Sequence, residues 1–466
     1  MNRNRFTLLL ASLALVSCEA LFPHSANPDN CMLDPTICDG AKGMVCNQTT
    51  QTCQMAGSCS AIAQCDSPSA VACQSGQCVA CTADTQCVVW STERNVSPAL
   101  KFCAVPTGAT GGTCGECKSN ANCVGVANAA FCDQTTLKCR GCLQNSECDS
   151  TVGAGDGVCK RPGDPATLPG MAGQCVTAGS IAYLGNSPAG CEMSGANASS
   201  VSKPYCNLMV AIASGKAVIK VLPSATPYPA ISLTTQTATL VGPGRDANPG
   251  AAFPSVDLNG SGTLTLSDVT VSASAGTAAV QCRGGGKLNV IASSITSTVN
   301  GVDADDCATL TIDRTRLSTP GRLAIQVGGT ASTSYRIVNS LVVDSGSAGN
   351  VHPVRLKSSA SGTFSFNTLT RNNGSVACLN NQVLSNSVLV NNSATPPAGC
   401  MASTSVTDDA VTLGDGAEPK LSATTKAREL VIDQATSVPQ GEFLTDYFGN
   451  QRPKGKGWDK GYHELE

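Results

Sequence analysis

The segment LTLSDV at residues 264–269 is the first of six similar segments in the second half of the chain. In most of them two apolar positions enclose a Ser, Thr or Asn at the fourth place, as Leu264 and Val269 enclose Ser267. From Ser267 to Asn386, the fourth places are separated by 26, 22, 24, 28 and 19 residues. The later segments are VIASSI at 290–295, IDRTRL at 312–317, RIVNSL at 336–341, FSFNTL at 364–369 and VLSNSV at 383–388.

This spacing predicts a β-solenoid. A repeat of about 24 residues accommodates three short strands and their turns, which is one rung of a parallel β-helix. A β-sandwich with irregularly spaced strands is the alternative. We predict an inward apolar ladder of Leu264, Val290, Ile312, Phe364 and Val383, and a polar ladder at a turn formed by Asn339, Asn367 and Asn386.

The first part of the chain is defined by its cysteines. Of 27 cysteines, 20 lie between Cys31 and Cys175 and divide into five modules of four. Modules of this size bury too little apolar surface to fold without cross-links, so we predict two disulfides in each. Four cysteines allow three connectivities, of which we choose first to third and second to fourth. Zinc is the alternative, because C-x2-C is a metal-ligand spacing, but the chain has only 3 histidines. The modules are Cys31/38/46/53, Cys59/65/73/78, Cys81/87/103/114, Cys117/123/132/139 and Cys142/148/159/175.

Six later cysteines form three predicted pairs, two of which are one rung apart in the sequence. Cys282 and Cys307 are separated by 25 residues, and Cys378 and Cys400 by 22. Neighbouring strands are about 4.8 Å apart, close to the distance that a disulfide spans. The third pair, Cys191 and Cys206, is expected to fasten the start of the solenoid.

The N-terminus carries an export signal. Basic residues at positions 3 and 5 precede an apolar segment at 6–16, which is too short to span a bilayer. The following Ser17-Cys18 resembles the cleavage site of bacterial lipoproteins, which implies a lipid on Cys18, and Glu19 implies the outer membrane. A plain signal peptide is the alternative. We therefore divide the chain into a signal peptide at 1–17, a lipidated tether at 18–30, a cysteine-rich region at 31–178 and a β-helix at 179–466.

Both ends of the last region resemble the pectin-lyase-like superfamily. CNLMVAIAS at 206–214 resembles the helix that begins those proteins, followed by a strand at 217–222 and a turn at Pro223. The segment 446–464 resembles their finish, D-x-x-G-x-x-R-P followed by D-x-G-A-x-E, with Tyr462 in place of the alanine. The resemblance implies an all-β chain with a right-handed parallel β-helix, here preceded by the disulfide-rich repeats.

Two segments of the chain resemble segments that enzymes of this superfamily use for catalysis and substrate binding. Asp303, Asp305 and Asp306 resemble the paired acids of polygalacturonases, and Arg355 and Lys357 resemble their Arg-x-Lys substrate clamp. Such acids would protonate a leaving oxygen and activate water. The family's Asn-Thr-Asp and Gly-His-Gly segments are missing, so an acidic turn and a solvated basic strand are the alternative. The acidic stretch Asp408, Asp409 and Asp415 is expected to be a solvated loop rather than a calcium site.

Composition narrows the function further. The net charge is −3, charged residues make up 14% of the chain, and there is no basic patch, so nucleic acid is not an expected partner. We expect no metal and no cofactor. The predicted function is a lipid-anchored envelope protein, exported and non-catalytic, that presents a rigid β-helix to a glycan or an envelope protein. The alternative is a divergent polysaccharide hydrolase or lyase.

Overall fold

A computed structural model describes most of the chain from residue 59 onward. Cys18, the predicted signal peptide and the tether lie outside the described residues, as do the side chains of the first cysteine module. Contacts divide the chain into two compact units, Met1–Val126 with Phe131–Arg140, and Ala127–Ala130 with Gly141–Glu466. The described ranges are 44–47, 52–55, 59–126, 129–149, 157–186, 190–193, 200–320, 322–346, 352–393, 397–416, 418–422, 424–435, 445–449, 452 and 458–464.

The four described cysteine modules share one design. In each, the third and fourth cysteines face each other across a two-stranded antiparallel hairpin, as Cys73 faces Cys78. The disulfides join first to third and second to fourth cysteines, as predicted. The hairpins are β3 (Ala72–Gln74) with β4 (Gln77–Val79), β5 (Phe102–Ala104) with β6 (Thr113–Gly115), β7 (Phe131–Asp133) with β8 (Lys138–Arg140), and β9 (Cys159–Lys160) with β10 (Gln174–Cys175). The first module's strands are β1 (Met44–Asn47) and β2 (Thr52–Met55).

A helical segment that begins just before the second cysteine completes each of the four modules whose side chains are described. The residue immediately before that cysteine accepts hydrogen bonds from two backbone N–H groups at the start of the turn, as Gln86 does from Thr82 and Ala83. Gln64, Asn122 and Glu147 do the same in the other modules. These turns are η3 (Ile62–Gln64), α1 (Asp84–Glu93), η4 (Asn120–Cys123) and η5 (Asn145–Cys148).

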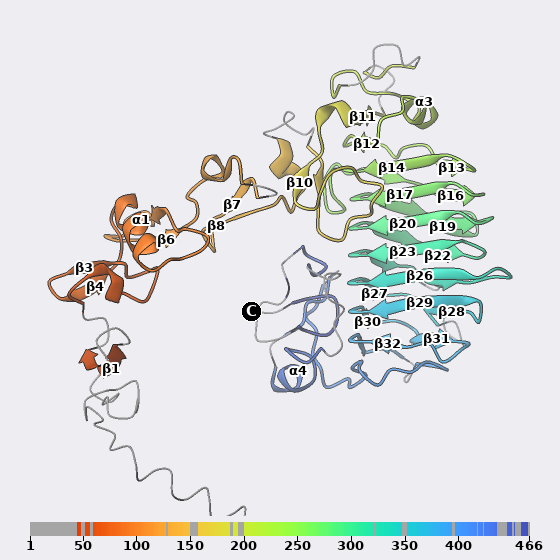
Figure 1. Ribbon diagram of the computed structural model, residues 1–466. Helices are drawn as coiled ribbons and strands as arrows, with labels where there is room; N and C mark the ends of the chain where they lie inside the picture. The colour runs from red at the N-terminus through yellow and green to blue at the C-terminus, as the bar shows by residue number, and fades with distance from the viewer. Residues whose placement is uncertain are drawn as a thin grey trace, which may run out of the picture. The chain divides into compact units, whose positions relative to one another are not determined.

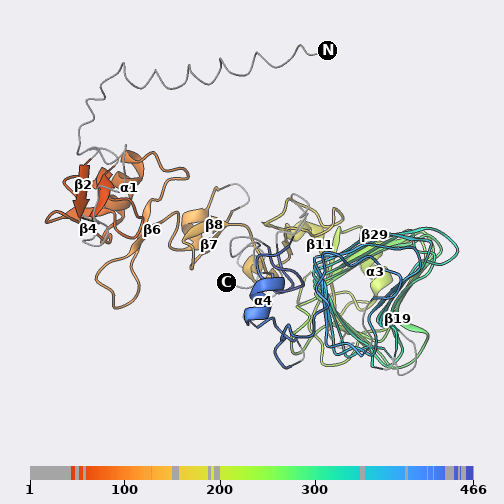
Figure 2. The same ribbon diagram turned by 90° about the horizontal axis from the view of Figure 1, so that it is seen from below.

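The second unit contains a parallel β-solenoid of three sheets (Figure 1). Seven rungs contribute one strand to each sheet and stack in register, and two earlier strands, β11 and β12, extend the first sheet (Figure 2). Sheet A is β11 (Ile181–Leu184), β12 (Val218–Val221), β14 (Thr237–Val241), β17 (Thr263–Ser267), β20 (Lys287–Ile291), β23 (Thr309–Asp313), β26 (Thr333–Val338), β29 (Ala360–Ser365) and β32 (Leu384–Ser385). Sheet B is β13 (Ile231–Leu233), β16 (Val256–Asn259), β19 (Ala278–Arg283), β22 (Asn300–Ala304), β25 (Ile325–Val327), β28 (Val354–Leu356) and β31 (Val376–Cys378). Sheet C is β15 (Ala252–Phe253), β18 (Thr270–Ala273), β21 (Ser294–Ser297), β24 (Arg316–Ser318), β27 (Leu341–Val343), β30 (Thr368–Thr370) and β33 (Val388–Val390).

The register corrects the predicted apolar ladder. Val290 pairs with Leu266 and not with Leu264, which lies one inward position earlier. Phe364 pairs with Leu384, while Val383 is 50% exposed. Because side chains alternate between the two faces of a strand, a shift of one residue moves a side chain out of the core. The observed ladder is Leu240, Leu266, Val290, Ile312, Ile337, Phe364 and Leu384.

The predicted asparagine ladder is also wrong in detail. Asn339 and Asn386 have positive φ values of 49° and 48°, and they occupy the left-handed corner between sheets A and C. Asn367 lies one position later, in a ladder in which the backbone N–H groups from Thr315 to Ser387 each donate to the side-chain oxygen of the next rung. Asn tolerates the left-handed conformation, so the asparagines of similar segments can lie either at the corner or one residue after it. The ladder consists of Ser293, Thr315, Ser340, Asn367, Ser387 and Ser405.

Both ends of the solenoid are covered. The helix α3 (Leu208–Ala213) begins at Asn207, whose side chain accepts from the N–H of Met209, and Ala211 joins the core (Figure 2). At the other end a single short rung from 398 to 406 pairs with the last strands. The helix α4 (Thr425–Leu430) and the short 3-10 turn η6 (Ala178–Ser180) complete the elements. In the described part of the chain, no helix is long and apolar enough to cross a membrane.

The C-terminal segment folds back onto the solenoid. We call residues 445–449, 452 and 458–464 the C-terminal clasp. Arg452 and Glu464 form a buried ion pair at 3.3 Å, and Arg452 also donates to the carbonyls of Asp459 and Gly461. The N–H of Glu464 donates to Asp446, so the charged residues of the predicted finishing motif meet in one cluster. The clasp docks on the solenoid through the Gly461 N–H, 2.7 Å from the carbonyl of Asn386.

Candidate functional site

Sheet B presents two rows of polar side chains to its outer face. In a strand, alternate residues point to opposite faces, so Val302 and Ala304 fill the core while Asp303 faces outward. The parallel register places the outward residues of successive rungs side by side. The first row is Asp257, Gln281, Asp303, Gln326 and Arg355. The second contains Asn259, Arg283, Asp305 and Lys357, with Gly328 on the rung between the last two, and we call the two rows together the polar face.

Three of the predicted site residues meet in the middle of this face. Lys357 Nζ lies 2.9 Å from both carboxylate oxygens of Asp305. The side-chain amide of Gln326 donates to Asp303 at 3.4 Å and to Asp305 at 3.2 Å. Arg283 Nη2 lies 3.1 Å from Asp303 Oδ2. Each acid therefore has its own cation, and Gln326 connects the two ion pairs.

Arg355 belongs to the same face but not to this cluster. Its neighbours in the register are Gln326 and Ala377. The side chain is half-buried, and among the described residues it has no hydrogen bond or ion pair. A guanidinium group without a partner offers a planar fork of donors to a carboxylate or to sugar hydroxyls. Asp257, at the other end of the row, is likewise half-buried.

Asp306 points away from the other acids. It has a φ of 61°, and its Oδ1 accepts a hydrogen bond from the backbone N–H of Ala331 at 2.6 Å. Thr330 donates to the same carboxylate. The hydrogen bond from Ala331 holds the pKa of Asp306 below its usual value. Asp306 is thus a turn residue that fastens the next rung.

The other acidic stretch has local partners. Asp408 lies 3.4 Å from Lys426 Nζ, and the hydrogen bond from the N–H of Ala410 lowers the pKa of Asp408. Asp409 accepts from the N–H of Asn391. These contacts fasten the loop to the last rung and to α4.

The cysteines of the repeats form sulfur clusters. In each described module the first, second and fourth Sγ atoms lie within 4.8 Å of one another. All of them are in disulfides, whereas metal binding needs thiolates. In the solenoid the structure joins the three late pairs, with Cα–Cα distances of 5.1 Å for Cys191–Cys206, 5.3 Å for Cys282–Cys307 and 5.0 Å for Cys378–Cys400.

Sequence reasoning did not identify Arg283, Gln326, Gln281 and Asp257. One signal was available, because Arg283 directly follows Cys282, whose spacing from Cys307 already indicated neighbouring rungs. Counting outward positions from those cysteines would have aligned Gln281 with Asp303. No protein-family model, no curated protein and no solved structure matches this chain.

Proposed function

We propose that the protein is a lipid-anchored envelope protein that binds an extended partner, a glycan or another envelope protein, through the polar face. The anchor is the lipidated Cys18 that the N-terminal segment predicts. One observation carries the binding proposal: two ion pairs and Arg355, which has no ion pair among the described residues, lie together on successive rungs of one polar surface. The rungs repeat about every 4.8 Å, a spacing that suits a chain-like ligand lying along the solenoid.

The chemistry of the face favours a glycan as the partner. Protein interfaces concentrate their binding energy in buried aromatic and apolar side chains. The rows of the polar face consist of carboxylates, amides and cations instead. At the centre of the face, Gln326 and the two ion pairs hold one another, so binding immobilises few additional rotamers there.

The proposal is tested by oligosaccharide binding to the mature chain. Titration calorimetry with acidic and neutral oligosaccharides should detect a ligand whose affinity falls at least tenfold in the double variant Arg355→Met with Lys357→Met. The matched control is Lys287→Met, an exposed lysine on sheet A, which should stay within twofold. Binding that survives the double variant would place the ligand elsewhere. If no oligosaccharide binds, the glycan proposal fails and a protein partner is sought by the same variants.

A polysaccharide-cleaving enzyme is the second candidate. The observation in its favour is that Asp303 and Asp305 lie together, both in contact with Gln326. Glycoside hydrolysis needs one protonated and one ionised carboxyl group. Here each acid is already engaged in an ion pair, Asp303 with Arg283 and Asp305 with Lys357, so neither carboxylate is free to contact a substrate. This argues for binding rather than cleavage.

Reducing-end release from polygalacturonate separates the two candidates. The binding proposal predicts no release above background. Release that disappears in Asp305→Asn but persists in Asp306→Asn would establish the enzyme instead, because Asp306 belongs to a turn.

The anchor is tested separately by metabolic labelling with an acyl-chain precursor. Label should enter the wild-type chain and be absent from Cys18→Ala. Equal label in both would exclude the anchor without affecting the binding proposal.

A further inference from the structure

The last cysteine module, residues 142–175, belongs to the same compact unit as the solenoid. The change in composition lies near residue 178, but the continuous part of the unit already starts at Gly141. Val158, Leu168 and Val176 around this module pack against the outward side chains of the first strands of sheet A. The covered side chains are Ile181, Tyr183, Val218 and Val241, and all four are at most 3% exposed.

Buried charges join the module to the solenoid. Arg161 donates to Asp268 at 2.9 Å and to Ser267 at 2.8 Å, and Asp164 forms an ion pair with Arg314 at 2.8 Å. Burial alone would lower the pKa of Arg161, but the carboxylates of Asp164 and Asp268 raise it above its usual value. A buried charge that loses its partner is strongly destabilising, so these pairs hold only while the module is in place.

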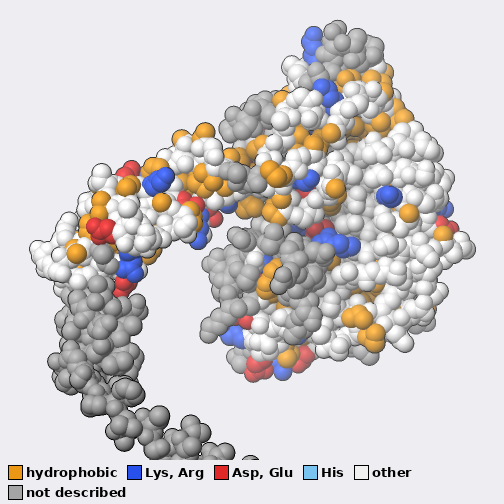
Figure 3. Space-filling view, viewed as in Figure 1, with side chains coloured by type: hydrophobic (Ala, Val, Ile, Leu, Met, Phe, Trp, Pro, Cys, Tyr) orange, Lys and Arg blue, Asp and Glu red, His pale blue; other side chains and the backbone are white. Residues whose placement is uncertain are grey.

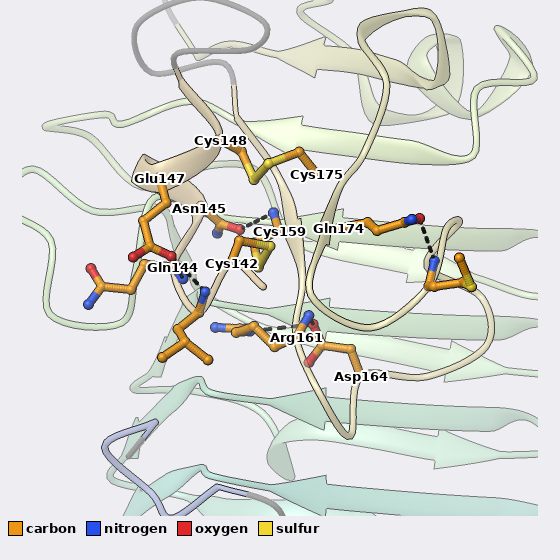
Figure 4. The surroundings of a disulfide bond; sticks show 12 residues. Cys142, Gln144, Asn145, Glu147, Cys148, Cys159, Arg161, Asp164, Gln174 and Cys175 are labelled. Carbon is orange, nitrogen blue, oxygen red and sulfur yellow. Dashed lines mark hydrogen bonds and ion pairs between the residues drawn. A yellow bond between two sulfur atoms is a disulfide. The ribbon is translucent and has the colours of Figure 1, made fainter. Parts of the chain in front are cut away.

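The disulfides hold the docking residues in position. Arg161 lies two residues after Cys159, and Asn145 lies between Cys142 and Cys148 (Figure 4). The Asn145 side chain accepts from the N–H of Cys159 at 2.9 Å and donates to Asp268 at 3.2 Å. The Asn145 side chain therefore forms one hydrogen bond within the module and another to the solenoid.

Other modules keep the internal contact and lack the docking contact. In the module of Cys117–Cys139, Asn120 accepts from the N–H of Cys132 just as Asn145 accepts from that of Cys159. The position equivalent to Arg161 is occupied there by Gln134, which donates to the carbonyl of Lys118 in its own module. The two modules thus share their internal contact, and Arg161 gives the last module an additional contact with the solenoid.

We propose that module 142–175 is a redox-dependent latch on sheet A. Its buried apolar residues face the solenoid, so apart from the solenoid the disulfides Cys142–Cys159 and Cys148–Cys175 are the main cross-links that hold its described residues folded. Cys175 is partly exposed while the other three are at most 1% exposed, so reduction begins at Cys148–Cys175. A dithiol reductant supplies two electrons and two protons, each opened disulfide becomes two thiols, and the reductant becomes a cyclic disulfide. The freed module leaves, and the apolar surface beneath it is exposed.

The test opens one disulfide in each of two equivalent modules of the full mature chain. The latch variant is Cys148→Ser with Cys175→Ser, and the matched control is Cys123→Ser with Cys139→Ser. Trypsin cleavage after Lys160 reports loosening of the module. Fluorescence of a dye that binds apolar surface reports exposure of the covered side chains of sheet A. We expect both signals to rise at least tenfold in the latch variant and less than twofold in the control.

A second variant separates docking from folding of the module. Arg161→Met keeps both disulfides and should raise both signals, while retention of Cys282–Cys307 in non-reducing mass spectrometry shows that the solenoid is intact. Dithiothreitol added to the wild-type chain should give the same signals in step with opening of Cys148–Cys175. Cleavage without dye binding would mean that the module loosens in place, and that outcome overturns the latch, as would equal signals in the control.

Discussion

Removal of Arg452 should release the C-terminal clasp. The Arg452 side chain and that of Glu464 are both 0% exposed, 3.3 Å apart. Burial lowers the pKa of Arg452, and the nearby carboxylates of Glu464, Asp446 and Asp459 oppose this. Arg452→Met would leave three buried acids without that cation.

The expected cost follows from these contacts. Breaking one side of a buried ion pair costs about 3–5 kcal/mol. At about 1.4 kcal/mol for each factor of ten, the local opening equilibrium shifts roughly 100-fold to 4,000-fold. The two hydrogen bonds from Arg452 to the carbonyls of Asp459 and Gly461 are lost in the same step. The effect should remain local, because the clasp docks on the outside of the stacked rungs.

Hydrogen exchange measures the opening directly. In the native clasp the Gly461 N–H donates to the carbonyl of Asn386 at 2.7 Å, and the Tyr447 N–H donates to the carbonyl of Tyr462 at 2.9 Å. Exchange of both amides should accelerate by the factor above, while amides of β20 to β26 keep their rates. Arg428→Met, at an exposed arginine of α4, is the control and should change neither. Acceleration below tenfold in Arg452→Met would refute the assignment of the ion cluster as the fastening of the clasp.

Three further outcomes follow from the fold. Gly461→Ala places a Cβ 2.9 Å from Val388 at a φ of +86°, so its amide exchange should also accelerate and the clasp should lose about 1–3 kcal/mol; wild-type exchange would refute the contact. Ile312→Ala, in the middle of the inward ladder, should lower the free energy of unfolding by about 2–5 kcal/mol, whereas Val383→Ala should change it by less than about 0.5 kcal/mol; equal losses in chemical denaturation would restore the ladder predicted from the sequence. Burial raises the pKa of Asp268 but Arg161 lowers it further, so its stabilising effect is complete above the unfolded value of about 3.9 and is lost as pH falls through the lower folded value. Acid should therefore expose sheet A to the dye at pH below about 4, a transition that Asp268→Asn should remove, and a flat titration down to pH 2 would contradict it.

The sequence by itself determined the fold class, since the apolar repeat requires a rung of three strands and the cysteine spacing requires short cross-linked modules. It also determined which cysteines are neighbours, because a gap of one rung places two residues side by side on adjacent strands, as at Cys282 and Cys307. The solenoid surface that faces the viewer in Figure 3 carries few charged side chains, in keeping with the 14% of charged residues in the sequence.

Only the tertiary structure decided the register and the contacts across it. Rungs differ in length, so the repeated text at Ser267 and Asn339 is displaced relative to the rungs, and Leu266 rather than Leu264 meets Val290. Stacking of the rungs likewise makes Lys357 the partner of Asp305, 52 residues away, whereas docking of the last cysteine module brings Arg161 to Asp268, 107 residues away. These partners are set by how the strands stack and how the module docks. The local sequence pattern does not show which distant residues become neighbours.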